Sequence, residues 1–486
     1  MERMIPKGLE PELVYEIFEE ISRIPRPSGH EEEISNWLVA FADKYHLSSV
    51  QDRKGNVLIR KAGTPGKEDH PGVILQSHMD MVCEKVPESN HDFMKDAIRI
   101  FVEGDKIVAK ETTLGADNAL GLAYSLAILT LKDVPHPPLE VLVTVDEEVG
   151  LTGAEEFDAS QLKGKYFINL DSGDEGIFTA GSAGGPTISA DIPISRKAPD
   201  SNQVPYCLCV EGLLGGHSGE DIHRHRGNAN KLLFRLLDAL GRKGDFEMAS
   251  VNGGMAGNAI PRSAEAVLMI SEKNRQILRD EMEKYDEIYR SEYRVSDPDI
   301  HVFLRPVDKE IHEVFTKESM DRVIDFGVFC ENGILRMSPD VEGVVESSNN
   351  LGSVTTGEEN VTFVFVTRSF LESMYQTMEM NIDRLARNAG GSSRRDYDCL
   401  EWAYEPESEL RELFIDVYRE LFHKEAKGVP VHTGLECGII AKNIGRKVDM
   451  ISIGSEIKES HKPGEWFSIS SAERYWKLLL EVLNRL

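Results

Sequence analysis

The chain has 486 residues, of which 41% are hydrophobic and 28% charged, values typical of a globular protein and not of a disordered or fibrous one. Asp and Glu outnumber Lys and Arg by 83 to 55, and the net charge of −28 argues against nucleic acid and against a polybasic membrane anchor, since both need a basic surface. At roughly 150 residues per domain, the length allows two or three domains.

The sequence has no segment that approaches the ~20 apolar residues of a membrane span. Its N-terminus lacks the charged-then-apolar plan of a secretory signal. The six cysteines are scattered without a C-x-x-C pair, which fits reduced thiols better than a disulfide framework. We therefore expect a cytoplasmic protein with no membrane contact and no nucleic-acid partner.

The first part of the chain predicts helices that alternate with strands. Ser28 and Glu31 form a capping-box pattern ahead of an apolar stripe at helical spacing. Three apolar runs are typical of buried strands and a longer one of a buried helix: 73–75, 139–145 and 166–170, and 121–131. This alternation predicts an α/β domain.

The pattern changes after the glycine-rich segment 181–186, which we interpret as a hinge. Two long apolar stripes at helical spacing then frame strand-like runs such as 361–366. Residues 187–398 therefore predict a separate α+β domain.

The C-terminal part of the chain again shows the pattern of buried strands and helices seen in the first segment. Residues 449–453 predict a buried strand, and Ser470 with Glu473 forms a second capping-box pattern at the start of a final amphipathic helix. Periodicity alone does not show whether the tail completes the first domain.

Histidine and acidic residues stand at four places where a predicted strand ends or a predicted helix begins: His78 and Asp80, Asp117, Glu147 with Glu148, and Asp171. Sites of open α/β sheets form at that edge. Crowded carboxylates raise one another's pKa, and a cation relieves this repulsion. Histidine with Asp and Glu suits zinc, and carboxylates can bridge two ions.

Two spacings support this chemistry. In an extended strand His78 and Asp80 point to one face, so that the carboxylate can orient the imidazole. Glu147 and Glu148 point to opposite faces if they continue the strand, so that one could bind metal while the other faces a substrate water. The pattern favours a metal hydrolase with a carboxylate general base.

Eight motifs carry a resemblance to a known family: SHMDMV (77–82), LGADN (114–118), DEEVG (146–150), NLD (169–171), GGHSG (215–219), GNAIPR (257–262), HTGLECG (432–438) and SHKPGE (460–465). They resemble those of the dizinc metallopeptidases that include peptidase T, peptidase V, carnosinases and glutamate carboxypeptidases. The likeness covers nearly the whole chain and is greatest to the bacterial Xaa-His (aminoacyl-histidine) dipeptidases of that family.

The resemblance implies a two-domain α/β fold with a central mixed sheet flanked by helices and an inserted α+β lid. The catalytic domain would consist of residues 1–186 and 399–486, and the lid of residues 187–398.

The resemblance also implies the ligands of two zinc ions, for which cobalt or manganese could substitute. His78 and Asp171 would bind one ion, Glu148 and His461 the other, and Asp117 would bridge them. Asp80 would support His78, and Glu147 would be the general base. The family tends to have Asp at the position of Asp171 in dipeptidases and aminopeptidases, and Glu in deacylases and carboxypeptidases.

Four residues would serve the substrate. His217 would stabilise the oxyanion, Asn258 and Arg368 would hold the substrate, and Gly434 would approach its carboxylate. Local sequence alone equally allows a solvated loop histidine at 217, a turn residue at 258 and a surface ion pair at 368.

The function implied is hydrolysis of dipeptides with a free N-terminus, Xaa-His including β-Ala-His and other dipeptides, by a homodimer. One alternative is an N-acyl amino acid deacylase or carboxypeptidase on the same scaffold. Another is a non-catalytic metal- or peptide-binding protein, against which the intact Glu147 argues. A dinuclear phosphatase is a more distant alternative, because no Arg or Lys cluster accompanies the metal motifs.

Overall fold

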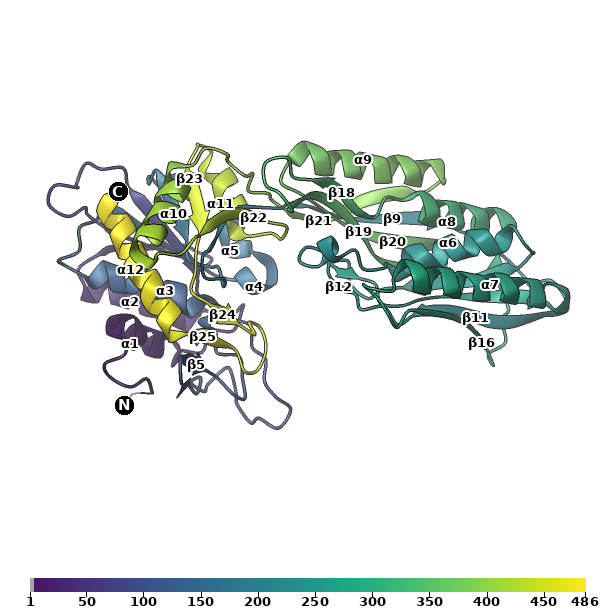
Figure 1. The fold of residues 1–486 in the computed structure, drawn as a ribbon, viewed down its shortest axis with the longest axis horizontal. Helices are drawn as coiled ribbons and strands as arrows, with labels where there is room; N and C mark the ends of the chain where they lie inside the picture. Colours follow the sequence, from purple (N-terminus) through teal and green to yellow (C-terminus); the bar gives the residue numbers. More distant parts are fainter. Residues whose placement is uncertain (1–3) are drawn as a thin grey trace. The chain divides into compact units, whose positions relative to one another are not determined.

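The computed structural model of the chain describes residues 4–486, except the side chains of Tyr397 and Asp398. Residues 1–3, with which the expected catalytic segment begins, lie outside it. The chain divides into two compact units, each described here by itself (Figure 1). Unit 1 takes in the chain up to Ser182, Tyr404–Val431 and Leu435–Leu486, and unit 2 consists of Ala183–Ala403 and His432–Gly434.

Unit 1 contains helices and strands from both ends of the sequence. Its helices are α1 Glu12–Ile21, α2 Glu32–Lys44, α3 Ala116–Thr130, α4 Glu147–Gly150, α5 Thr152–Glu156, η1 Ala159–Gln161, α10 Glu409–Phe422, α11 Glu436–Ile444 and α12 Ile469–Arg485. Its strands are β1 Ser48–Gln51, β2 Val57–Lys61, β3 Val73–His78, β4 Phe101–Glu103, β5 Lys106–Val108, β6 Leu139–Thr144, β7 Tyr166–Asn169, β8 Ile177–Ser182, β22 Lys427–Val431, β23 Asp449–Ser452, β24 Ile457–Lys458 and β25 Trp466–Ser468.

The main sheet of unit 1 is mixed, with the strand order β1-β2-β6-β3-β7-β23-β8-β22. Its centre, β6-β3-β7-β23, is parallel and consists of the four strands predicted from apolar runs. Alternate residues of β3 point to opposite faces, and all six are buried, because helices cover both faces. Val73 and Leu75 join the core formed with helices α1, α3 and α12. The fold-class prediction is thereby confirmed for this unit.

Both predicted capping boxes are wrong in detail. The N-cap of α2 is Glu31 itself, and Ser28 Oγ donates instead to Asp80 Oδ2 at 2.7 Å. The N-cap of α12 is Ser468, whose hydroxyl accepts from Ser471 N, while the hydroxyl of Ser470 donates to Asp105 Oδ2 at 2.8 Å. In both places a partner distant in sequence takes a side chain that local spacing assigns to the helix start.

Unit 2 is an antiparallel sheet with helices. Its strands are β9 Gly185–Pro193, β10 Arg196–Lys197, β11 Gln203–Glu211, β12 Gly216–His217, β13 Glu247–Gly253, β14 Ala259–Ile260, β15 Ala264–Ser271, β16 His301–Pro306, β17 Val314–Phe315, β18 Gly333–Met337, β19 Val345–Thr356, β20 Asn360–Ser369 and β21 Ser392–Cys399. Its helices are η2 Ile222–Arg224, α6 Ala229–Gly241, α7 Glu272–Glu292, α8 Lys317–Phe329 and α9 Glu372–Asn388.

The large sheet of unit 2 has the order β16-β11-β15-β13-β19-β20-β9-β21, with β18 beside β19. One face packs against helices α6 to α9 in a core of its own, to which Leu208 and Val210 of β11 contribute. The predicted α+β character of this block is confirmed. The glycine-rich segment 181–186 runs through the end of β8 and the start of β9, where the chain passes from one unit to the other.

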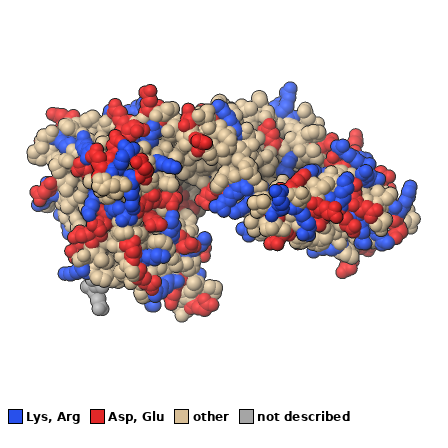
Figure 2. All heavy atoms as spheres, viewed as in Figure 1, with Lys and Arg blue, Asp and Glu red and all other residues tan. Residues whose placement is uncertain are grey.

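Charged side chains of both signs are interspersed over the face shown in Figure 2, so the acidic excess is not gathered into one patch there. Among residues 4–486, the helices include none with the length and apolarity to cross a membrane.

Candidate active site

The parallel centre of the unit 1 sheet brings three predicted motifs to one edge. His78 is the last residue of β3, Glu147 and Glu148 follow β6, and Asp171 follows β7. Because these strands are parallel neighbours, their carboxyl ends meet, as they do at ligand-binding edges of other α/β sheets.

Asp117 joins this edge from the first turn of α3. Gly115 precedes the helix with φ +67°, a left-handed conformation that glycine adopts without strain, and Asp117 itself has non-helical angles of φ −79° and ψ 102°. The helix therefore starts earlier than the predicted residue 121, with its first turn distorted around the carboxylate.

The Asp117 carboxylate lies between two groups of side chains. Its Oδ1 is 3.1 Å from His78 Nε2, which is also 3.5 Å from Asp171 Oδ1. Its Oδ2 is 3.2 Å from His461 Nε2, which is in turn 3.2 Å from Glu148 Oε2. Within each group of three, one donor atom per residue lies within 4.8 Å of the others.

Asp80 lies behind His78 and is fully buried. Its carboxylate accepts from His78 Nδ1 at 3.2 Å, from Ser28 Oγ, and from the backbone N–H groups of Glu147 and Glu148, each at 3.1 Å. Burial alone would raise the pKa of Asp80, but the hydrogen bond and charge of His78 bring it down to about 2. Asp80 thus fixes both the imidazole and the Glu147–Glu148 turn.

The predicted strand geometry of Glu147 and Glu148 is wrong. The two residues open the short helix α4, because Asp146 turns the chain with φ +58° two residues after the end of β6. His78, Glu147 and Glu148 form a third group of donor atoms within 4.8 Å. The two carboxylates therefore lie on the same side as the imidazole, separated by the turn and not by the pleat of a strand.

The electrostatics of this cluster suit cations. Burial raises the pKa of Asp171 to about 7 and that of Glu147 well above its usual value, with neighbouring carboxylates adding to both shifts. One oxygen of Glu148 is buried without a hydrogen-bond partner. Two divalent cations between these groups would favour the ionised carboxylates and occupy the vacant lone pairs, so the donor set fits a dinuclear centre.

Three supporting residues were not singled out from the sequence. Glu465, which is buried, accepts from the N–H groups of Leu114 and Gly115 at 2.8 and 2.9 Å and holds the loop that leads to Asp117. Buried Arg26 donates to the carbonyl oxygens of Asp80 and Gly115 at 2.9 and 2.7 Å. Asn118 Nδ2 donates to Asp171 Oδ1 at 2.6 Å. In the sequence, only their position within or near one of the motifs could have pointed to these three residues.

Glu436 is a further buried acid on this side of unit 1. It accepts from Gln76 Nε2 at 2.7 Å and Thr144 Oγ1 at 2.8 Å, and burial raises its pKa to about 8. It stands at the start of α11, within the motif at 432–438, and no role was predicted for it.

The four predicted substrate residues belong to unit 2. His217 lies on β12, paired with Ala259 of β14. Its Nδ1 accepts from the N–H groups of Gly219 and Glu220, each at 3.3 Å, so the neutral ring carries its proton on Nε2. Burial and then the charge of Arg368 lower the pKa of His217, which keeps the ring neutral.

Ser218 connects two of the other three residues. Its N–H donates to the carbonyl oxygen of Asn258 at 2.8 Å, and its hydroxyl accepts from Arg368 Nε at 3.4 Å. Gly434 lies against Cys399, whose sulfur would clash with a Cβ at that position. His217, Asn258 and Arg368 are therefore neighbours within unit 2. The side chain of Arg368 contacts a buried serine, which does not fit the alternative of a surface ion pair.

Comparison with known proteins identifies the family to which the chain belongs. Residues 210–297, which include His217 and Asn258, match the model described as the peptidase dimerisation domain. The chain is 36% identical over 478 residues to the cytosol non-specific dipeptidase of Escherichia coli K12, a match that covers 98% of each chain.

Solved structures agree with the sequence comparison. The aminoacylhistidine dipeptidase from Vibrio alginolyticus matches with a TM-score of 0.92 and 36% identity over 99% of this chain and 97% of that one. Aminopeptidase PepT from Bacillus cereus, at a TM-score of 0.56 and 14% identity over 98% of each chain, shares the fold. With 36% identity across nearly its whole length, the chain belongs to the M20 peptidase family, whose motifs its sequence resembles.

Proposed function

We propose that this protein is a cytoplasmic, metal-dependent dipeptidase that cleaves dipeptides with a free N-terminus, Xaa-His including β-Ala-His among them. One observation carries the proposal: a single carboxylate, Asp117, faces a His–Asp pair with one oxygen and a His–Glu pair with the other. The names of the two 36%-identical relatives, a non-specific dipeptidase and an aminoacylhistidine dipeptidase, support the substrate class.

In this proposal unit 1 is the catalytic domain and holds two zinc ions, with cobalt or manganese as possible substitutes. His78 and Asp171 would hold one ion, Glu148 and His461 would hold the other, and Asp117 would serve both. When bound, the ions polarise the scissile carbonyl and make water more acidic. Asp80 keeps the proton of His78 on Nδ1, so that Nε2 is free to ligate.

The remaining steps belong to side chains. Glu147 takes a proton from the attacking water and delivers it to the leaving amine. Its proximity to His78 and Glu148 supports this role, since donor atoms of the three lie within 4.8 Å of one another. The carboxylate must be ionised to act as a base, and neighbouring cations would lower its raised pKa.

Unit 2 is the lid in this proposal, and it supplies the substrate contacts. His217 donates from Nε2 to the developing oxyanion, a role that its neutral ring with an accepting Nδ1 supports. Asn258, Arg368 and Gly434 hold the substrate, with Arg368 as the cationic group. The dimerisation-domain match at 210–297 supports a homodimer.

The test is amino acid release by the zinc-loaded protein from Ala-His, β-Ala-His, Ala-Ala, N-acetyl-His and Ala-Ala-His, with and without a chelator. We expect chelator-sensitive cleavage of the free-amine dipeptides alone. Cleavage of N-acetyl-His would replace the proposal by a deacylase. Bound zinc without turnover of any substrate would replace it by a metal- or peptide-binding protein.

A further inference from the structure

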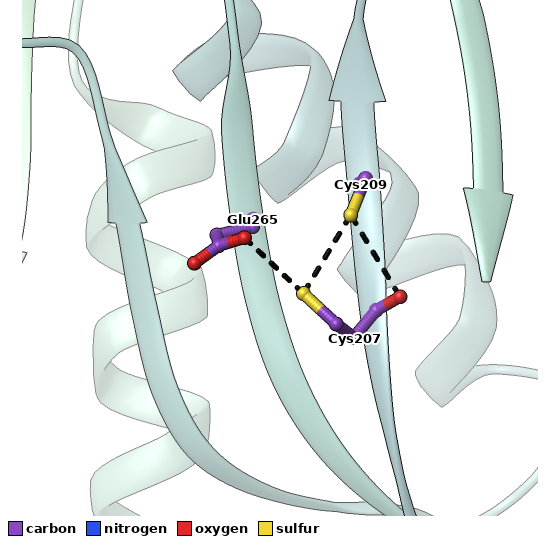
Figure 3. Close-up of side chains that lie close together, drawn as sticks. All are labelled: Cys207, Cys209 and Glu265. Atoms are coloured by element: carbon purple, nitrogen blue, oxygen red, sulfur yellow. Dashed lines mark hydrogen bonds between the residues drawn. The ribbon is translucent and has the colours of Figure 1, made fainter. Parts of the chain in front are cut away.

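A second cluster of potential metal ligands lies in unit 2, among residues to which the proposed peptidase mechanism assigns no role. Cys207 and Cys209 are two residues apart on β11, and Glu265 lies on the neighbouring strand β15, opposite Cys209. Figure 3 shows the three side chains pointing toward one another. The two sulfurs are 3.6 Å apart, and Cys207 Sγ is 3.3 Å from Glu265 Oε2.

The pleat of the strand accounts for the arrangement. Residues two apart point to the same face, and Leu208 and Val210 already occupy the face that packs against the helices. Cys207 and Cys209 therefore share the opposite face, yet their exposed fractions are only 2% and 0%. The Glu265 side chain is 43% exposed, so the cluster reaches solvent through the carboxylate.

The sulfur–sulfur distance matches that of two thiolates on one tetrahedral ion. Two zinc–sulfur bonds of ~2.3 Å at a tetrahedral angle place their sulfurs roughly 3.8 Å apart, close to the spacing already present. The carboxylate adds a third ligand, and one position stays open for water. The three donor atoms lie within 4.8 Å of one another.

The surrounding charges also suit a divalent cation. Two thiolates and one carboxylate carry three negative charges. A divalent ion leaves one of these uncompensated, and Arg305, whose Nη2 is 2.6 Å from Glu265 Oε2, balances it.

A disulfide fits the same pair less well. Two residues apart on a regular strand, Cα atoms are separated by about 6.6–6.8 Å, the upper limit for a disulfide. The strand is held by unbroken pairing with β15 on one side and β16 on the other, so it has little freedom to bring the sulfurs together.

We infer that Cys207, Cys209 and Glu265 form a third metal site, which takes one thiophilic divalent cation such as zinc and is independent of the peptidase centre. Binding replaces the two thiol protons, which pass to solvent, and forms two metal–sulfur bonds and one metal–oxygen bond without any change of oxidation state. The bound ion would join β11 to β15 through side chains.

Cadmium is the probe that separates this site from the peptidase centre. The candidate ligands of that centre are oxygen and nitrogen atoms only, whereas cadmium thiolates give a charge-transfer band in the near ultraviolet. Reduced, full-length protein with zinc in the peptidase centre is titrated with cadmium chloride. We expect the band to saturate at one cadmium per chain and to disappear when excess zinc is added.

Variants locate the band. Cys207→Ser/Cys209→Ser should abolish it, whereas Cys330→Ala, which removes another buried thiol of unit 2, should leave it intact. Glu265→Gln should weaken cadmium binding by about tenfold or more while keeping the band at saturation, and Glu283→Gln, an exposed glutamate of α7, should have no effect.

Three results would overturn the inference: no band in the wild type, a band that survives the double substitution, or a Cys207–Cys209 disulfide in place of bound metal. If the double variant fails to fold, the cadmium affinities of Glu265→Gln and Glu283→Gln test the inference instead. Equal affinities for these two variants would contradict it. Dipeptide cleavage is measured separately, so failure of the proposed peptidase function leaves this result intact.

Discussion

The two units differ in the electrostatics of their buried polar clusters: the carboxylates at the sheet edge of unit 1, and Arg368 with His432 in unit 2. In unit 1, burial among carboxylates raises the pKa of Asp171 to about 7, whereas in unit 2 burial and the charge of Arg368 lower the pKa of His432 to about 3. The same cause, burial beside like charge, leaves the first cluster short of positive charge and the second short of negative charge. The difference teaches that the carboxylate edge of unit 1 favours cations, whereas the surroundings of Arg368 and His432 in unit 2 favour anionic groups.

The clusters also differ in how they are built. Five separate segments meet where parallel strands end and helix α3 begins, and they contribute His78, Asp117, Glu148, Asp171 and His461. His217 lies on β12, which pairs with β14, and the N–H group of the next residue, Ser218, donates to the carbonyl oxygen of Asn258. The cation-favouring cluster therefore depends on several supporting contacts from distant parts of the chain.

The largest effect should follow from removal of the proposed base. Glu147→Ala should lower kcat by roughly 10²–10⁴-fold while metal content stays at the wild-type value, because the residue moves a proton and is not a proposed ligand. Metal analysis and dipeptide kinetics check this. Glu155→Ala, an exposed glutamate of α5, is the matched control. Turnover near that of the wild type would show that another group is the base.

Removal of His217, the proposed donor to the oxyanion, should have the second-largest effect on turnover. His217→Ala should lower kcat by roughly 10²–10³-fold with a smaller change in KM, since an oxyanion donor acts mainly in the transition state. His223→Ala, which replaces an exposed histidine of helix η2 nearby, should behave as the wild type. A change confined to KM would make His217 a ground-state binding residue and weaken the contrast between the units.

A supporting contact of unit 1 should have an intermediate effect. Glu465→Gln replaces a carboxylate oxygen that accepts from two N–H groups ahead of Asp117, and should weaken metal binding by roughly 10–100-fold. Excess zinc should then restore most of the activity, as competition with a chelating dye can measure. Activity loss that zinc does not restore would point to a collapsed loop.

The smallest effects concern ion pairs. Glu175 of unit 1 accepts from Arg474 at 2.7 and 2.5 Å; burial opposes its ionisation, but these bonds bring its pKa down to about 2. Glu175→Gln should lower the free energy of unfolding by about 2 kcal/mol at pH 7. Glu292 of unit 2 pairs with Arg235 with side-chain exposed fractions of 40% and 46%, and Glu292→Gln should cost less than about 1 kcal/mol.

The pH dependence follows from the sign of the Glu175 shift. A pKa lower in the folded than in the unfolded state gives stability that is fully present above the ordinary value of 4.5 and is lost as pH falls toward about 2. The difference between wild type and Glu175→Gln should therefore shrink below about pH 4. Denaturant unfolding at pH 7, 5 and 3 measures it, and a constant difference would contradict the assignment.

Local patterns predicted the central strands well, because four apolar runs bounded by polar residues had to be buried on both faces. They failed at helix starts. Ser28 and Ser470 both fit a capping box, but Asp80 and Asp105 take their hydroxyls. Glu147 and Glu148 were expected on a strand, but the left-handed turn at Asp146 ends it first. In each case the local structure is set by a contact or a turn that the spacing of nearby residues does not reveal.

The sequence by itself determined the fold class and the family, because apolar runs and motif residues are local properties that the chain carries before it folds. Only the tertiary structure decided which atoms meet. His461, with φ +64° and no helical or strand pattern around it, reaches Asp117 and Glu148 because the chain folds back beside α3. Glu465 and Arg26 become supports for the same reason: burial and partners more than 50 residues away are properties of the folded chain.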